Sequence, residues 1–185
     1  MQPCRVHITG ASGSGTTTLG RALAQAWSVP CHDTDDFYWL PQEPEFSIKR
    51  PVAERLELME RMFLPRRAWV LSGSLMGWGD GLMHRFDLVV FLRMDSAERL
   101  KRLKKREQQR YGSEALQAGG LRHKKYQAFL KWAAGYDDPD FSGRNRIGHE
   151  NWLAHLTCPV LQLDSAASTE DLVDTIVAAK IDDRQ

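Results

Sequence analysis

The sequence lacks the features that mark membrane-bound and secreted proteins. No stretch approaches the roughly 18 consecutive apolar residues of a membrane-spanning helix. The opening residues MQPCRVHITG also lack the charged start and apolar run of a secretory signal. The formal net charge is only +1, which gives no reason to expect a nucleic acid or a membrane as a partner. We therefore expect a cytoplasmic protein with neither kind of partner.

Cysteine is scarce as well, since the chain contains only three, Cys4, Cys31 and Cys158. They are scattered and odd in number, and neither they nor the histidines show metal-ligand spacing, so we expect no disulfide framework and no zinc-type site. Each cysteine lies at the edge of a predicted strand, where a small buried side chain is the favoured interpretation. His7, which falls in an apolar strand pattern, is expected to pack in the core.

Apolar runs and helical patterns alternate along the 185 residues, a length that predicts a single domain over residues 1–185. Runs rich in β-branched residues predict five strands, in the stretches CRVHIT, VPCHDTDDF, AWVLSG, DLVVFLRM and CPVLQLD. Between them, Pro51 suits the first position of a helix, Asp95 can cap another helix, and the last helix opens near Ser168. Strands that alternate with helices need crossover connections. The sequence therefore predicts an α/β fold with an open, mostly parallel five-stranded sheet and helices on both faces.

One segment, residues 107–150, breaks this alternation. It contains no convincing buried strand and is rich in Gly, Tyr, Trp, Arg and Lys. It is also too long for an idle loop in a compact domain. We interpret it as a largely helical, lid-type insertion that covers a site, with Gly119, Gly120 and the stretch YDDPDFSG from Tyr136 as its irregular or hinge-like parts.

The strongest functional signal is the stretch GASGSGTTTLG, which begins at Gly10. It follows an apolar strand and precedes an amphipathic helix, as does the phosphate-binding loop Gly-x-x-x-x-Gly-Lys-Ser/Thr, whose backbone N–H groups hold phosphates. Gly10, Gly15 and Thr17 fit this pattern, but Thr16 stands where the pattern has lysine. The residues expected to bind the nucleotide are Gly10, Ala11, Ser12, Gly13, Ser14, Gly15, Thr16, Thr17 and Thr18. Thr17 occupies the position whose hydroxyl ligates magnesium, whereas the missing lysine means that catalytic charge must come from elsewhere.

Two other interpretations of this loop remain open. A dinucleotide-binding turn needs glycine at its first, third and sixth positions, and counting from Gly13 the sixth position holds Thr18. A Gly-Ser-rich turn without any ligand is the second alternative. The first alternative implies a dinucleotide-dependent oxidoreductase, and the second implies no bound ligand at this position.

Three acids follow the second predicted strand, in the stretch HDTDDFYW. Ligands of open α/β sheets bind beyond the carboxyl ends of the strands, so these acids should face the same site as the phosphate-binding loop. On an extended chain Asp33 and Asp35 point the same way, and Asp36 points the opposite way. A carboxylate beside a phosphate can hold magnesium or accept the proton of an attacking hydroxyl. We therefore expect a functional role for at least one of Asp33 and Asp35, with an Asp-rich turn as the alternative.

A glycine-rich stretch, LSGSLMGWGD, follows the third predicted strand. Gly73, Gly77 and Gly79 would let the backbone approach a substrate closely. Met76 or Trp78 could line the pocket for that substrate. A plain surface loop is the alternative.

Basic residues that could replace the missing lysine lie in two places. The run RLKRLKKREQQR puts Arg99, Arg102 and Arg106 on one helix face. From there Arg102 or Arg106 could reach nucleotide phosphates as an arginine finger does, although a solvated charged face explains the run equally well. Arg144 and Arg146, in SGRNRIGHE, are candidates because a lid that closes over phosphates commonly brings arginine with it. We therefore expect Arg106, Arg144 and Arg146 to supply the catalytic charge.

Several of these stretches, taken in order, resemble the small P-loop kinases related to adenylate and shikimate kinases. They are GASGSGTTTLG, DTD, DLVVFLRMDSAERLKRLKKRE and CPVLQLD. The chain is further similar to an uncharacterised adenylate kinase-like or topology-modulation-like branch, in which threonine habitually replaces the loop lysine. The resemblance implies that Asp33 helps to hold magnesium through water and that Asp35 contacts the acceptor hydroxyl. It also implies that Arg106 contacts the phosphates or the base of ATP.

Together these patterns predict a phosphotransferase that depends on ATP and Mg²⁺. Its acceptor would be a small hydroxyl-bearing molecule or a nucleoside monophosphate. Thr17 and Asp33 are expected to hold the metal, Asp35 is expected to contact the acceptor, and the three arginines are expected to offset the missing lysine. The alternative is a catalytically weak nucleotide-binding sensor or regulatory protein that keeps the same fold.

Overall fold

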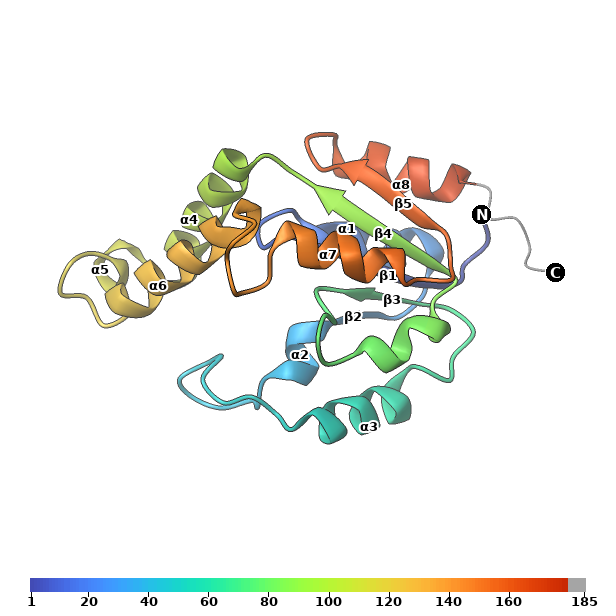
Figure 1. Ribbon diagram of the computed structural model, residues 1–185, viewed down its shortest axis with the longest axis horizontal. Helices are drawn as coiled ribbons and strands as arrows, with labels where there is room; N and C mark the ends of the chain where they lie inside the picture. Colours follow the sequence, from blue (N-terminus) through green and yellow to red (C-terminus); the bar gives the residue numbers. More distant parts are fainter. Residues whose placement is uncertain (180–185) are drawn as a thin grey trace.

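The computed structural model describes residues 1–179, whose five strands form one parallel sheet (Figure 1). The strands are β1 Arg5–Gly10, β2 Cys31–Asp33, β3 Trp69–Ser72, β4 Leu88–Arg93 and β5 Val160–Asp164. Their order across the sheet is β2-β3-β1-β4-β5, and each neighbouring pair is parallel. The predicted α/β fold is confirmed, because each strand overlaps the stretch predicted for it.

Helices connect the strands. They are α1 Thr16–Trp27, α2 Thr34–Tyr38, α3 Val52–Met62, α4 Ser96–Tyr111, α5 Ser113–Leu116, α6 His123–Ala134, α7 Arg146–Ala154 and α8 Thr169–Ala178, with the 3₁₀ helices η1 Asp80–Arg85 and η2 Gly135–Asp137. The predicted cap of α4 and the predicted start of α8 are confirmed, because the side chains of Asp95 and Ser168 accept hydrogen bonds from first-turn N–H groups. Pro51 occupies the position just before α3 instead of forming its first residue, so that start was predicted one position too early. None of the helices within residues 1–179 is long and apolar enough to cross a membrane.

The sheet has a separate hydrophobic core on each face, since successive side chains of a strand point to opposite faces. Val6 and Ile8 of β1 pack with residues of α1 and α8. Phe91 of β4 belongs to the core formed with α3 and α7. Figure 1 shows α7, in orange, lying across this second face. Because both faces are packed, the carboxyl ends of the strands form a fixed edge on which a site can be built.

The predicted core positions of His7 and the cysteines are confirmed in part. His7 is fully buried and stacks on Phe86 with ring centroids 5.0 Å apart, as expected for a packing histidine. Cys158 is buried too, but Cys4 and Cys31 are only half-buried. Cys31 lies on the edge strand β2, where neighbouring elements cover a side chain less completely, and Cys4 lies just before the first residue of β1.

The segment of residues 107–150 is largely helical, as predicted. It comprises the end of α4, all of α5, α6 and η2, and the start of α7. Gly119, with a φ of 86°, and Gly120 lie in the irregular connection between α5 and α6. In Figure 1 the helices α4 to α6 project from the sheet as an arm. We call residues 107–150 the helical insertion, and its function as a lid stays a prediction.

The aspartate-rich stretch after β2 differs from the prediction. The strand ends at Asp33, and residues 34–38 form the short helix α2. This happens because the carboxylate of Asp33 accepts a hydrogen bond from the N–H of Asp35 at 3.1 Å and so caps the helix. The prediction that Asp33 and Asp35 share one side of an extended chain is therefore wrong.

Candidate functional site

The phosphate-binding loop, residues 10–17, runs from the end of β1 into the first turn of α1. Gly13 and Gly15 have φ angles of 87° and 94°, which other residues rarely adopt. A Cβ atom at Gly10 would lie only 2.6 Å from the carbonyl oxygen of Leu92, so a side chain there would push the loop away from β4. The first N–H groups of α1 have no partner within the helix, and the helix dipole favours an anion beside them. The loop therefore has the backbone of a phosphate cradle, although Thr16 carries no charge.

Beside the cradle, three side chains from separate elements meet at the carboxyl edge of the sheet. The hydroxyl of Thr17 donates a hydrogen bond to Oδ2 of Asp33 at 2.7 Å, and the hydroxyl of Ser72 donates to the same oxygen at 3.1 Å. Within residues 1–179 no group of three or more His, Cys, Asp or Glu side chains could hold a metal. A hydroxyl and a carboxylate nevertheless provide oxygen ligands, which Mg²⁺ prefers. Few protein ligands are needed, because Mg²⁺ usually completes its coordination shell with water and phosphate oxygens. Thr17 and Asp33 therefore fit the predicted metal.

Asp35 lies in the first turn of α2, next to this cluster. Its carboxylate remains in contact with solvent, but the surrounding chain displaces part of its hydration. This burial, together with the negative charge of Asp33, raises the pKa of Asp35, whereas the positive charge of Arg144 lowers it. A carboxylate with a raised pKa holds a proton more readily, which suits a general base.

Two guanidinium groups reach the phosphate-binding loop at Ser12. Nη2 of Arg144 donates a hydrogen bond to the hydroxyl of Ser12 at 2.8 Å, and Nη1 of Arg99 donates to its carbonyl oxygen at 3.3 Å. Burial lowers the pKa of Arg144, and the charge of Asp35 raises it. The group still keeps its proton, as arginine does in proteins. The loop without a lysine therefore has positive charge beside it, supplied from α4 and from the helical insertion.

Arg106, the α4 residue favoured from the sequence, points elsewhere. It forms an ion pair with Glu107 at 2.9 Å, and half of its side chain is exposed. Arg102, one turn earlier, lies closer to the loop. Its guanidinium donates to Oγ of Ser165 at 3.4 Å and lies 3.8 Å from the place of a Cβ atom at Gly15. The role of Arg106 at the phosphates stays a prediction, and Arg102 is the α4 residue beside the cradle.

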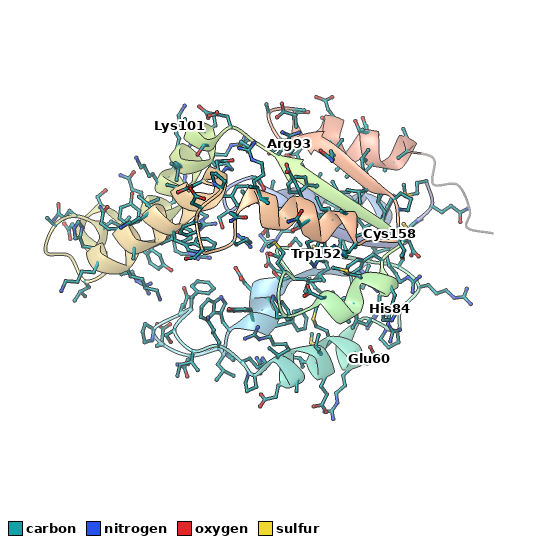
Figure 2. The ribbon with its side chains drawn as sticks, in the orientation of Figure 1. Glu60, His84, Arg93, Lys101, Trp152 and Cys158 are labelled. Carbon is teal, nitrogen blue, oxygen red and sulfur yellow. The ribbon has the colours of Figure 1, made fainter. Side chains whose placement is uncertain are left out.

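Arg146 lies at the first position of α7. It pairs with Asp137, which also forms an ion pair with the buried Arg99 at 2.5 Å. A cavity of about 580 Å³ opens here between the ends of β4 and β5, bordered by Ala11, Asp137 and Arg146. Figure 2 labels Arg93 at the end of β4, beside this cavity. Arg146 is therefore near the cradle but already paired.

A buried cation, Arg55 of α3, escaped the sequence analysis. It is only 5% exposed, and its guanidinium lies 3.9 Å from the ring centroid of Tyr38 and 5.1 Å from that of Trp78. Over residues 1–179 no carboxylate forms an ion pair with it. The sequence does contain one indication that Arg55 is buried, because it lies one turn before the buried Met59, on the apolar face of α3.

The glycine-rich stretch after β3 packs against α2. Gly73 has a φ of 112°, and a Cβ atom there would lie 1.9 Å from Oγ1 of Thr34. The same oxygen accepts a hydrogen bond from the N–H of Ser74 at 3.1 Å. The close approach that Gly73 permits is therefore to Thr34, and approach of this loop to a substrate stays a prediction.

The helical insertion also touches the connection between α2 and α3. The ammonium group of Lys125, on α6, donates to the backbone oxygens of Glu45 at 2.6 Å and Phe46 at 3.3 Å. The guanidinium of Arg110 lies 5.4 Å from the ring centroid of Phe46. We call these contacts the Lys125 bridge. They connect two segments that lie on the same side of the molecule in Figure 1.

Solved structures with this fold include small-molecule kinases. A gluconokinase from Sinorhizobium meliloti 1021 superimposes with a TM-score of 0.54 at 20% identity, covering 95% of this chain and 90% of that chain. A shikimate kinase from Acinetobacter baumannii gives a TM-score of 0.53 at 17% identity, covering 95% of this chain and 91% of that one. At these identities the likeness concerns the fold alone. With its cradle between β1 and α1, the chain is a P-loop protein with the fold of small-molecule kinases.

Sequence comparison gives the family. The AAA domain family AAA_18 matches residues 6–119, and the chain belongs to this family. A curated relative, the uncharacterized protein YqaC of Bacillus subtilis (strain 168), is 45% identical over 172 residues, which cover 93% of this chain and 94% of that protein. The two proteins are thus similar over nearly their whole lengths.

Proposed function

We propose that this protein is a phosphotransferase that uses ATP and Mg²⁺ and transfers the terminal phosphoryl group to a small acceptor, either a hydroxyl compound or a nucleoside monophosphate. The observation that carries the proposal is the hydrogen bond from Arg144 to Ser12, in a phosphate-binding loop without lysine. A guanidinium beside this loop can supply the charge that lysine otherwise supplies, because arginine binds phosphate oxygens through several donors at once. The fold of small-molecule kinases supports the same class of reaction.

Each part of the site has a role in this proposal. The backbone of residues 10–18 holds the phosphates, and Thr17 and Asp33 would hold Mg²⁺, which when bound neutralises phosphate charge. Asp35 accepts the proton of the acceptor hydroxyl, a role that its raised pKa favours. Arg144 stabilises the negative charge of the phosphates, with Arg106 and Arg146 as further candidates. The helical insertion excludes water from the transfer.

The direct test combines a binding measurement with a transfer assay. Calorimetry should detect ATP binding in the presence of Mg²⁺. Asp35→Asn should abolish transfer while leaving ATP affinity within about twofold, because the change removes a proton acceptor and leaves the cradle intact. Asp36→Asn, at the next residue of α2, is the matched control and should retain transfer. A wild-type protein that binds no ATP would overturn the proposal.

We place the acceptor beside Arg55, whose guanidinium lies against Tyr38 and Trp78 and donates from Nε to the carbonyl oxygen of Arg50 at 2.6 Å. No carboxylate of residues 1–179 forms an ion pair with this buried charge, and an anionic group of a ligand can offset the cost of burying it. This favours nucleoside monophosphates and sugar acids over neutral sugars. A thermal-shift screen of all three classes, with a non-hydrolysable ATP analogue present, should therefore give its largest shifts with the anionic compounds. Equal shifts with neutral sugars would contradict this preference.

A nucleotide-binding sensor without turnover is the second candidate, and Thr16 is the observation that favours it. In that case wild-type protein binds ATP but neither transfers nor hydrolyses it. Thr16→Lys would then produce a large gain in hydrolysis or transfer, because the lysine adds charge at the terminal phosphates. Measurable phosphoryl transfer by the wild type would exclude the sensor and support the phosphotransferase.

A further inference from the structure

His149 of α7 is a fully buried histidine with a hydrogen-bond partner at each ring nitrogen. Nε2 lies 3.0 Å from Oγ1 of Thr9, and Nδ1 lies 2.8 Å from the hydroxyl of Tyr136. A neutral imidazole donates at one nitrogen and accepts at the other, and both hydroxyls can take either role. Burial, together with the charge of Arg144, lowers the pKa of His149 to about 3. The three side chains therefore form a neutral, fully hydrogen-bonded group inside the protein.

This group joins the phosphate-binding loop to the helical insertion. Thr9 is the residue before Gly10, where the loop begins, and its position in β1 is fixed by pairing with Phe91 of β4. Tyr136 belongs to η2 in the insertion. His149 also makes an edge contact with the ring of Phe91, at a centroid distance of 5.4 Å. It is therefore held on three sides at the point where α7 crosses β1 and β4.

The position of Arg144 follows from the position of α7. Asn145 caps this helix, since its side chain accepts a hydrogen bond from the N–H of Gly148 at 2.7 Å, and it also donates to the carbonyl oxygen of Phe141 at 2.8 Å. Arg144 thus belongs to a short segment that is attached to the helix start. Farther along α7, Trp152 donates from Nε1 to Asp80 at 2.8 Å, and Figure 2 labels it between α7 and η1.

We propose that His149 is a positioning residue of the nucleotide site, which fixes α7 against β1 through Thr9 and against η2 through Tyr136, and thereby holds Arg144 at Ser12. This rests on the proposed function, because Arg144 acts on phosphates only if the loop binds a nucleotide. A lysine within the loop is placed by the loop itself. A cation that comes from a distant segment needs a rigid connection between that segment and the loop, and the hydrogen bonds of His149 provide it.

The test is a double-mutant cycle on ATP affinity, measured by calorimetry with Mg²⁺ on the full chain. Tyr136→Phe removes one hydroxyl and should weaken ATP binding by about three- to tenfold, in keeping with the loss of one hydrogen bond. If His149 acts through Arg144, the same change in an Arg144→Gln background should alter affinity by less than about twofold. Thr9→Val, which removes the other partner hydroxyl, should behave in the same way.

A histidine that only stabilises the core would give a different pattern. Tyr136→Phe would then have equal effects in both backgrounds, or none in either, and both outcomes would overturn the inference while leaving ATP binding by the wild type intact. Absence of ATP binding by the wild type would instead overturn the proposed function, and this inference with it. His7→Phe is the matched control, since His7 is equally buried in β1 but bonds to the backbone oxygen of Leu71. It should lower the melting temperature without changing ATP affinity.

Discussion

Moving the positive charge from Arg144 into the loop tests the site most directly. Arg144→Gln removes the guanidinium that donates to Ser12 at 2.8 Å. A hydrogen bond that involves a charged group contributes about 1.5–3 kcal/mol, and each 1.4 kcal/mol corresponds to a tenfold change in affinity. The dissociation constant of ATP should therefore rise by about 10- to 100-fold. Binding should not vanish, because Arg99 still lies at the carbonyl oxygen of Ser12, at 3.3 Å.

The decisive variant adds a lysine at the position where phosphate-binding loops have it. Thr16→Lys combined with Arg144→Gln should restore most of the lost affinity, because the lysine reaches the same phosphates from the other end of the loop. Arg144→Lys should give an intermediate loss, since it keeps the charge but not the forked donors. The assay is calorimetry with ATP and Mg²⁺ at one fixed ionic strength, because salt screens these charges. The reasoning is refuted if Arg144→Gln binds ATP as tightly as wild type, or if Thr16→Lys restores nothing.

Three further predictions concern stability and access. Burial lowers the pKa of His7 to about 4 from 6.5, so the unfolded chain binds more protons between these values, and the free energy of unfolding should fall as the pH drops through this range. By pH 5 the loss should reach about 2 kcal/mol, and urea unfolding of His7→Phe should lack this part of the slope. Gly73→Ala should cost about 1–3 kcal/mol more than Gly77→Ala in the same assay. Both glycines have a positive φ, but only the Cβ atom at Gly73 would meet Thr34. Lys125→Ala breaks the Lys125 bridge, so hydrogen exchange over residues 40–50 should quicken while the melting temperature stays nearly constant, because the contacts are exposed.

The sheet and the cradle could be predicted because their signals are local. Each strand is a short apolar run, and the glycines of the loop stand at the spacing that its turns require, as the positive φ angles of Gly13 and Gly15 bear out. The direction of Asp35 could not be predicted. The choice between an extended chain and a helix after β2 depends on the cap formed by Asp33, and polar residues in such a stretch allow both conformations.

The arginines show why tertiary contacts limit such predictions. Helical spacing places Arg102 and Arg106 on one face of α4 but says nothing of which reaches the cradle, since that depends on the packing of α4 against the loop after β5. The contact of Arg144 with Ser12 depends on the folding of the whole helical insertion. His149 gave no signal, because its partners lie in two other elements of the chain.

The hydrogen bond between Arg144 and Ser12 joins residues 132 positions apart, and this separation matters for how the site evolves. The region that matches the AAA domain family ends at residue 119, so it contains the cradle, Thr17 and Asp33 but not Arg144. If Arg144 replaces the loop lysine, loss of either residue should be tolerated best in a chain that has the other. The two positions should therefore vary together among relatives, and a protein with neither residue should bind nucleotide more weakly, with Arg99 still at the carbonyl oxygen of Ser12.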